Sequence, residues 1–123
     1  MKYSSSFYYD LDLGESSETW LNELFSDGKK IEVKTDLMAD KTKNIFVEIY
    51  SRGKQSGLST TQAEYWIIKM TNVSVIISTK NLKEIVRHCF SINGYKKGGD
   101  NDTSLGVLVP INLLFNENIS DNI

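Results

Sequence analysis

Two segments in the first half of the chain alternate strictly between apolar and other residues, and they most constrain the possible fold. The segments are residues 30–36 (KIEVKTD) and 45–50 (IFVEIY). Side chains two positions apart share one face of a strand, so each segment predicts a β-strand with an apolar and a polar face. A short polar loop, residues 37–43, joins them. We therefore expect the two strands to pair as an antiparallel hairpin.

The charged face of this expected hairpin brings two acids together. In the natural register Glu32 lies opposite Glu48, and Lys34 lies opposite Phe46. Cross-strand neighbours sit roughly 5 Å apart, where two carboxylates repel by on the order of 1 kcal/mol. A divalent cation reverses the sign, because Mg²⁺ takes oxygen ligands from carboxylates. The alternative is an edge hairpin whose alternating charges simply face solvent.

A lysine one pleat from such a metal has a chemical use. Lys34 can orient or deprotonate an attacking water, or offset charge that builds up on a phosphate. We therefore expect Glu32, Lys34 and Glu48 to be catalytic. The predicted metal ligands are Glu32 and Glu48, with Glu18 or Asp36 reaching the ion directly or through water.

Length and charge narrow the class of protein. With 123 residues the chain predicts one domain, residues 1–123, with flexible ends at 1–6 and 117–123. The net charge of −2 argues against non-specific coating of nucleic acid and leaves room for a local basic rim. The sequence lacks a run of ~18 apolar residues and an apolar signal-peptide core, so we expect no membrane partner and a cytoplasmic location.

The single cysteine predicts a structural residue and no disulfide framework. Cys89 falls on the apolar stripe of an expected helix, and the adjacent His88 points elsewhere on that helix. A small core side chain is therefore the better interpretation than a nucleophile.

The N-terminal part predicts a strand and then a helix. Residues 7–13 alternate as a strand does, and residues 15–25 carry an apolar helical stripe of Trp20, Leu21, Leu24 and Phe25. Glu18 lies at the edge of that stripe and would face the sheet or its rim. In the alternative interpretation, Glu15 and Glu18 only favour the positive end of the helix dipole.

A glycine-rich basic loop follows the second strand. Residues 51–59 contain Arg52, Lys54 and Ser56, and they run into a helix start at Thr60 and Thr61. Free N–H groups at a helix start with cations nearby can hold a nucleic-acid phosphate. These five residues are the predicted DNA-binding residues. Such a loop can also be no more than a solvated connection.

The C-terminal half alternates strands and helices. Residues 73–78 predict a central strand covered on both faces, and residues 81–93 predict a helix that ends at Gly94. Residues 95–104 predict a mobile loop and residues 105–109 a short strand. Pro110 predicts the first turn of a helix with buried Ile111, Leu113, Leu114 and Phe115, ahead of a frayed polar tail.

The order of these elements resembles the core of the PD-(D/E)XK nuclease superfamily, which includes restriction enzymes and Holliday junction resolvases. Glu32-Val33-Lys34 is similar to its E-x-K motif, and Glu18 or Glu15 to its helix acid. Small phage-encoded nucleases of the superfamily are similar over residues 32–36, 44–48, 52–57, 60–66 and 98–110. The resemblance implies an α/β fold: a restriction-endonuclease-like mixed sheet with an acidic antiparallel hairpin and flanking helices.

The chain departs from that superfamily at one position. Between the first helix and Glu32 there is no room for a separate strand bearing the usual aspartate. Either Asp27 takes that role from a turn, or Glu32 and Glu48 are the two strand acids and the lysine has moved to the first strand. The second arrangement agrees with the expected hairpin.

The function that the resemblance implies is Mg²⁺- or Mn²⁺-dependent endonuclease activity on DNA, with branched DNA cut by a homodimer as one form of it. Two alternatives remain. One is a nuclease-fold protein that binds DNA or serves as a scaffold without turnover, because a fold does not fix a function. The other is a nucleotide or phosphate-ester hydrolase that uses the same metal site.

Overall fold

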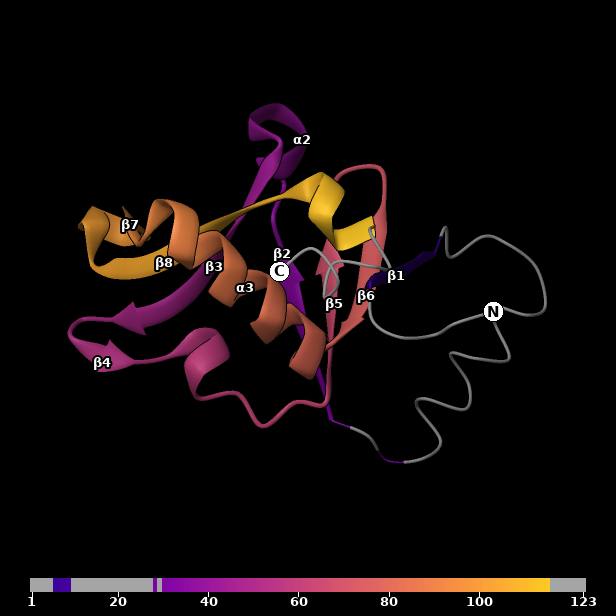
Figure 1. Ribbon diagram of the computed structural model, residues 1–123, viewed down its shortest axis with the longest axis horizontal. Helices are drawn as coiled ribbons and strands as arrows, with labels where there is room; N and C mark the ends of the chain where they lie inside the picture. Colours follow the sequence, from indigo (N-terminus) through magenta and orange to yellow (C-terminus); the bar gives the residue numbers. More distant parts are fainter. Residues whose placement is uncertain (1–5, 10–27, 29, 116–123) are drawn as a thin grey trace.

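The computed structural model describes residues 6–9, 28 and 30–115. These residues form two four-stranded β-sheets and two α-helices, which confirms the α/β class (Figure 1). No helix in this part of the chain is long and apolar enough to span a bilayer.

The first sheet has the strand order β1-β6-β5-β2. Its strands are β1 (Ser6–Tyr9), β2 (Ile31–Thr35), β5 (Tyr65–Lys69) and β6 (Ser74–Ser78). Strand β2 pairs in parallel with β5, and the other pairs are antiparallel. Val75, Ile76 and Ile77 of β6 are all buried, so the prediction of a central strand covered on both faces is confirmed.

The second sheet has the strand order β4-β3-β8-β7, and every pair in it is antiparallel. Its strands are β3 (Asn44–Ser51), β4 (Lys54–Gln55), β7 (Lys96–Gly98) and β8 (Ser104–Pro110). The predicted strand at 105–109 is therefore confirmed, one residue longer at each end. Strand β7 falls in the stretch that the sequence predicts as a mobile loop, so that prediction is wrong there.

Helix α3 (Thr79–Asn93) is capped at both of its ends. It begins after Ser78, whose side chain accepts a hydrogen bond from the N–H of Asn81, and it ends at Gly94. The predicted helix is confirmed, with a start two residues earlier. Helix α2 (Ala39–Thr42) is one turn. Three 3-10 turns complete the description: η1 (Gly57–Ser59), η2 (Asp100–Asp102) and η3 (Ile111–Phe115).

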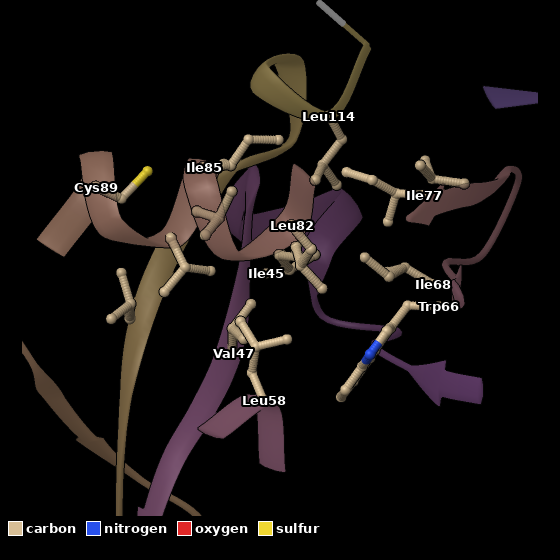
Figure 2. Packing of buried hydrophobic residues seen from close by; sticks show 14 of the residues in the cluster. Ile45, Val47, Leu58, Trp66, Ile68, Ile77, Leu82, Ile85, Cys89 and Leu114 are labelled. Atoms are coloured by element: carbon tan, nitrogen blue, oxygen red, sulfur yellow. The ribbon is translucent and has the colours of Figure 1, made fainter. Parts of the chain in front are cut away.

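One core joins the two sheets through α3. Figure 2 shows side chains of α3, among them Leu82 and Ile85, packed with Ile45 of β3 and Ile77 of β6. Each fully buried aliphatic side chain of this kind stabilises the fold by about 1.5–3 kcal/mol. Cys89 belongs to the same cluster and is 3% exposed, which confirms it as a core residue.

The expected hairpin between the first two strands is wrong. Strand β2 belongs to the first sheet and pairs with β5, whereas β3 belongs to the second sheet and pairs with β4 and β8. The turn of α2 separates the two strands. Beyond it, the N–H of Phe46 donates to the Asp36 side chain at 3.2 Å instead of to a ladder carbonyl of β2. The opposition of Lys34 and Phe46 is therefore also wrong.

The helix expected from Thr60 is a second error. Residues 65–69 form strand β5, and η1 ends before Thr60. The run Tyr65-Trp66-Ile67-Ile68 is aromatic and β-branched, which favours a strand over a helix. At the C-terminal end, Pro110 closes β8, and η3 is a 3-10 turn whose fully buried residue is Leu114.

The remaining predictions lie partly or wholly outside the described residues. The strand expected at 7–13 is described as β1, Ser6–Tyr9. The helix at 15–25 with its acids Glu15 and Glu18, the turn residue Asp27 and the tail from 116 are outside the described ranges.

Candidate functional site

Strand β2 of the first sheet and β3 of the second diverge below α2 (Figure 1). Residues of both strands line a polar cleft. Its volume is about 580 Å³, within the usual range of ligand sites. The cleft is lined by Glu32, Val33, Lys34, Glu48, Gly57, Thr60, Thr61, Gln62 and Trp66. The structure therefore brings the three predicted catalytic residues to one site, although they do not share a hairpin.

The register of β2 with β5 determines which face of the first sheet carries Glu32 and Lys34. Glu32 pairs with Trp66 and Lys34 pairs with Ile68 in the parallel ladder. Paired residues share a face of a sheet, and both Trp66 and Ile68 are buried in the core. Glu32 and Lys34 therefore lie on the inner face of the first sheet. Val33 lies on the other face and is 62% exposed.

Glu48 is held by two serine hydroxyls. Ser56 Oγ donates to Oε2 of Glu48 at 2.9 Å, and Ser104 Oγ donates to Oε1 at 2.8 Å. Hydrogen bonds to a charged acceptor are worth about 1.5–3 kcal/mol each. Ser104 is 4% exposed, so its hydroxyl is fixed inside the sheet. Ser56 directly follows β4, and Ser104 is the first residue of β8. The two donors together fix the Glu48 carboxylate in one orientation.

The backbone beside Glu48 is irregular. The register of β3 with β8 shifts between Glu48 and Tyr50, which is the signature of a β-bulge. Gly57 then packs so closely on this bulge that a Cβ there would overlap the carbonyl oxygen of Glu48, and its φ is +55°. A glycine is required for both reasons. The bulge and Gly57 together bring η1 against Glu48.

Among the described residues that line the cleft, Lys34 is the one with a cationic side chain. Burial lowers the pKa of the Lys34 ammonium below its ordinary value of 10.5, and the carboxylates of Asp36 and Glu48 act in the opposite direction. Desolvation disfavours the charged form of a lysine, whereas nearby carboxylates favour it. The net lowering increases the fraction of Lys34 that is neutral, and only the neutral amine can accept a proton.

The other two predicted acids have separate partners. Thr61 Oγ1 donates to Oε1 of Glu32 at 3.2 Å, which ties the loop before β5 to β2. Asp36 accepts the N–H of Phe46 and acts electrostatically on Lys34. Asp36 therefore lies near Lys34 but is not among the residues that line the cleft.

The cleft has the donor chemistry of a magnesium site. Glu32 and Glu48 supply carboxylate oxygens, and Mg²⁺ usually keeps several waters and takes one or two carboxylates from a protein. Within residues 6–9, 28 and 30–115, no three His, Cys, Asp or Glu side chains lie close enough to hold a metal ion. The carboxylates that line the cleft among the described residues are those of Glu32 and Glu48, and Glu18 lies outside these residues.

The predicted DNA-binding residues fall in three different places. Arg52 and Lys54 are exposed at the turn from β3 into β4. Thr60 and Thr61 line the cleft without starting a helix. Ser56 faces Glu48, so its observed partner is a carboxylate.

Several site residues were not predicted from the sequence. Ser104 contacts Glu48 from a strand 56 positions away, and serine in a strand carries no signal for such a contact. Gln62 and Trp66 line the cleft, and the indole N–H of Trp66 has no hydrogen-bond partner among the described residues. For Gly57 a signal existed, because a glycine next to a strand end often marks a close backbone approach.

Comparison of the chain with protein-family models, with curated proteins and with solved structures found no match in any of the three. The function is therefore inferred from the residues of the cleft and their geometry.

Proposed function

We propose that the cleft binds a phosphodiester of DNA and hydrolyses it with the help of Mg²⁺ or Mn²⁺, within a restriction-endonuclease-like fold. One observation carries the proposal: Glu32 and Lys34 of one sheet and Glu48 of the other line the same cleft. Two carboxylates beside a lysine of lowered pKa are the groups that metal-assisted phosphodiester hydrolysis needs.

Lys34 acts on the attacking water or on the phosphate. The lowered pKa increases the fraction of Lys34 in the neutral form, which can accept a proton from water, and in its charged form Lys34 offsets negative charge that develops on the phosphate oxygens. Asp36 and Glu48 keep the ammonium from losing its proton too readily, because both carboxylates favour the charged form.

Glu48 and Glu32 would hold the metal, with Asp36 or Glu18 contributing through water. The metal supplies Lewis-acid stabilisation of the phosphate and a more acidic water. Ser56 and Ser104 orient the Glu48 carboxylate, and Thr61 orients that of Glu32. Each carboxylate oxygen has two lone pairs, so a hydroxyl donor leaves one available.

Phosphate contacts hold the DNA in place. Thr60 lies within the cleft and offers a hydroxyl to a backbone phosphate. Arg52 and Lys54 are exposed where β3 turns into β4, a few residues after Glu48. They supply the local basic rim that a chain of net charge −2 needs in order to bind DNA.

A second candidate is a DNA-binding or scaffold protein without turnover. The observation that favours it is the pair of serine hydrogen bonds, which engage both carboxylate oxygens of Glu48. In that case Glu48 serves to join β3, β8 and the segment before η1.

Incubation with linear, nicked and four-way-junction DNA tests the proposal. The purified chain is compared in Mg²⁺, in Mn²⁺ and in EDTA, with Glu48→Gln as the inactive variant and Glu84→Gln of α3 as a control outside the cleft. We expect metal-dependent products from the wild type and from Glu84→Gln, and none from Glu48→Gln or in EDTA. DNA binding without products under every condition would favour the scaffold function.

A further inference from the structure

Two lysines far apart in the sequence flank Glu48 on one face of the second sheet. In the ladder of β4, β3, β8 and β7, Lys54 pairs with Ser51 and Ser51 with Ser104, which in turn pairs with Gly98. Two residues along β8, Glu48 pairs with Gly106, and Gly106 pairs with Lys96. Paired residues share a face, so Lys54 and Lys96 lie on the same side of the sheet as Glu48.

Side-chain contacts confirm this assignment of faces. Ser104 reaches the Glu48 carboxylate, which requires both side chains on one side. The ring of Phe46 occupies the space into which side chains at Gly98 and Gly106 would project. Helix α3 covers the opposite face, where Val47 and Val107 are buried (Figure 1). We call the uncovered side the Glu48 face; it is formed by Phe46, Glu48, Ser51, Lys54, Lys96, Gly98, Ser104 and Gly106.

Between its two lysines the Glu48 face carries two short side chains and one aromatic ring. Ser51 and Ser104 are small, and the Phe46 ring fills the space over Gly98 and Gly106. Both lysines are exposed at the edges of the sheet, one on β4 and one on β7.

We propose that the Glu48 face carries the DNA backbone across the sheet, with Lys54 and Lys96 each contacting a phosphate on either side of Glu48. The inference rests on the proposed function in one respect, that the ligand is DNA. It adds Lys96 as a DNA-contact residue and states that the DNA backbone crosses the sheet between β4 and β7.

The spacing of the two lysines fits this ligand. Three inter-strand steps of about 4.8 Å separate β4 from β7, so the lysines lie about 14 Å apart across the sheet. One strand of duplex DNA carries a phosphate about every 3.4 Å along the helix axis, so this span covers roughly four phosphates. Contacts at the two ends leave the phosphates between them over Glu48.

The neighbouring lysine supplies a matched control. Lys97 follows Lys96 directly and is also exposed, but it pairs with Leu105 and so lies on the opposite face of β7. Asp100 and Asp102 of η2 follow β7, so each lies one residue closer in sequence to Lys97 than to Lys96. Removal of either lysine changes the net charge equally, so a difference between the two variants reports position on the sheet.

Salt-dependent DNA binding tests the inference. Fluorescence anisotropy with labelled duplex and single-stranded DNA, in EDTA to prevent cleavage, is measured over a range of salt for the wild type, Lys54→Ala, Lys96→Ala, Lys97→Ala and the Lys54→Ala/Lys96→Ala double variant. We expect Lys96→Ala to reduce the slope of log K against log salt by about 0.9 on duplex or 0.7 on single strands, the double variant to reduce it by about twice that, and Lys97→Ala to leave it unchanged.

Rescue and folding controls complete the test. Lys96→Arg should restore the slope, and Lys96→Gln replaces Lys96→Ala if thermal melting shows that the alanine variant is unfolded. Equal slopes for the Lys96 and Lys97 variants, or no DNA binding by the wild type, would overturn the inference. Failure of the proposed hydrolysis is a different result: a wild type that shows the Lys96-specific slope yet yields no product with Mg²⁺ or Mn²⁺.

Discussion

Ser104 Oγ donates a 2.8 Å hydrogen bond to Oε1 of Glu48, a residue 56 positions earlier in the chain. Because Ser104 is buried in β8 and Glu48 sits at the bulge of β3, this bond fixes the orientation of the carboxylate at the cleft. Ser56 completes the arrangement on the other oxygen.

Loss of this bond should weaken both the fold and the site. We expect Ser104→Ala to lower the free energy of unfolding by about 1.5–3 kcal/mol, measured by urea denaturation, because the bond has a charged acceptor. In a Glu48→Gln background the same substitution should cost less, since the acceptor is then neutral. Thr79→Val, which removes another buried hydroxyl, one that donates to Ala63, is the control and should show no coupling to Glu48. Additive losses for Ser104 and Glu48 would contradict the role of this bond.

A second prediction concerns the glycine packed on the bulge. Gly57→Ala combines a strained positive φ with a Cβ that overlaps the Glu48 carbonyl, whereas Gly53 also has a positive φ, of +77°, but open space around it. We expect Gly53→Ala to cost about 1 kcal/mol of unfolding free energy, and Gly57→Ala to cost clearly more and to disturb the cleft. Amide chemical shifts of β3 should move in the Gly57 variant alone. Similar costs and shifts for the two variants would show that η1 does not press on Glu48.

A third prediction follows from the pKa of Lys34. Unfolded, the lysine titrates near its ordinary 10.5, and in the folded chain its pKa is lower. Between the two values the unfolded chain binds more protons, so the free energy of unfolding should rise with pH in the window just below 10.5. Lys34→Met should lack this rise. Glu48→Gln should widen the window downward, because the Glu48 carboxylate raises the pKa of Lys34. Identical pH profiles for wild type and Lys34→Met would contradict the lowered pKa.

The sequence predicted the elements that local patterns define. Strand β6 has the β-branched centre Val75-Ile76-Ile77, and α3 carries an apolar stripe between capping residues, so both were found within one or two residues. The partners of strands were not found. Alternation in residues 31–35 shows which side chains share a face, but it does not say that β2 pairs with β5 instead of β3.

The candidate site was predicted in part for the same reason. Glu32, Lys34 and Glu48 do line one cleft, because their strands diverge from the common turn at α2 with these side chains toward the gap. The contacts of Ser104 and the position of Lys96 depend on how β8 and β7 join β3, which no local pattern contains. Strand β7 was missed because Lys96-Lys97-Gly98 has the composition of a loop.

The most direct test of the proposed hydrolysis is the single-turnover rate of DNA cleavage by Lys34→Ala in Mg²⁺. Lys69→Ala, an exposed lysine at the end of β5, is the matched control, and DNA affinity in EDTA checks that binding is intact. We expect Lys34→Ala to bind DNA as the wild type does and to cleave it more than tenfold more slowly. Lys69→Ala should cleave DNA at the wild-type rate. A Lys34→Ala rate above about a tenth of the wild-type rate, equivalent to a loss of less than about 1.4 kcal/mol of transition-state stabilisation, would contradict this expectation.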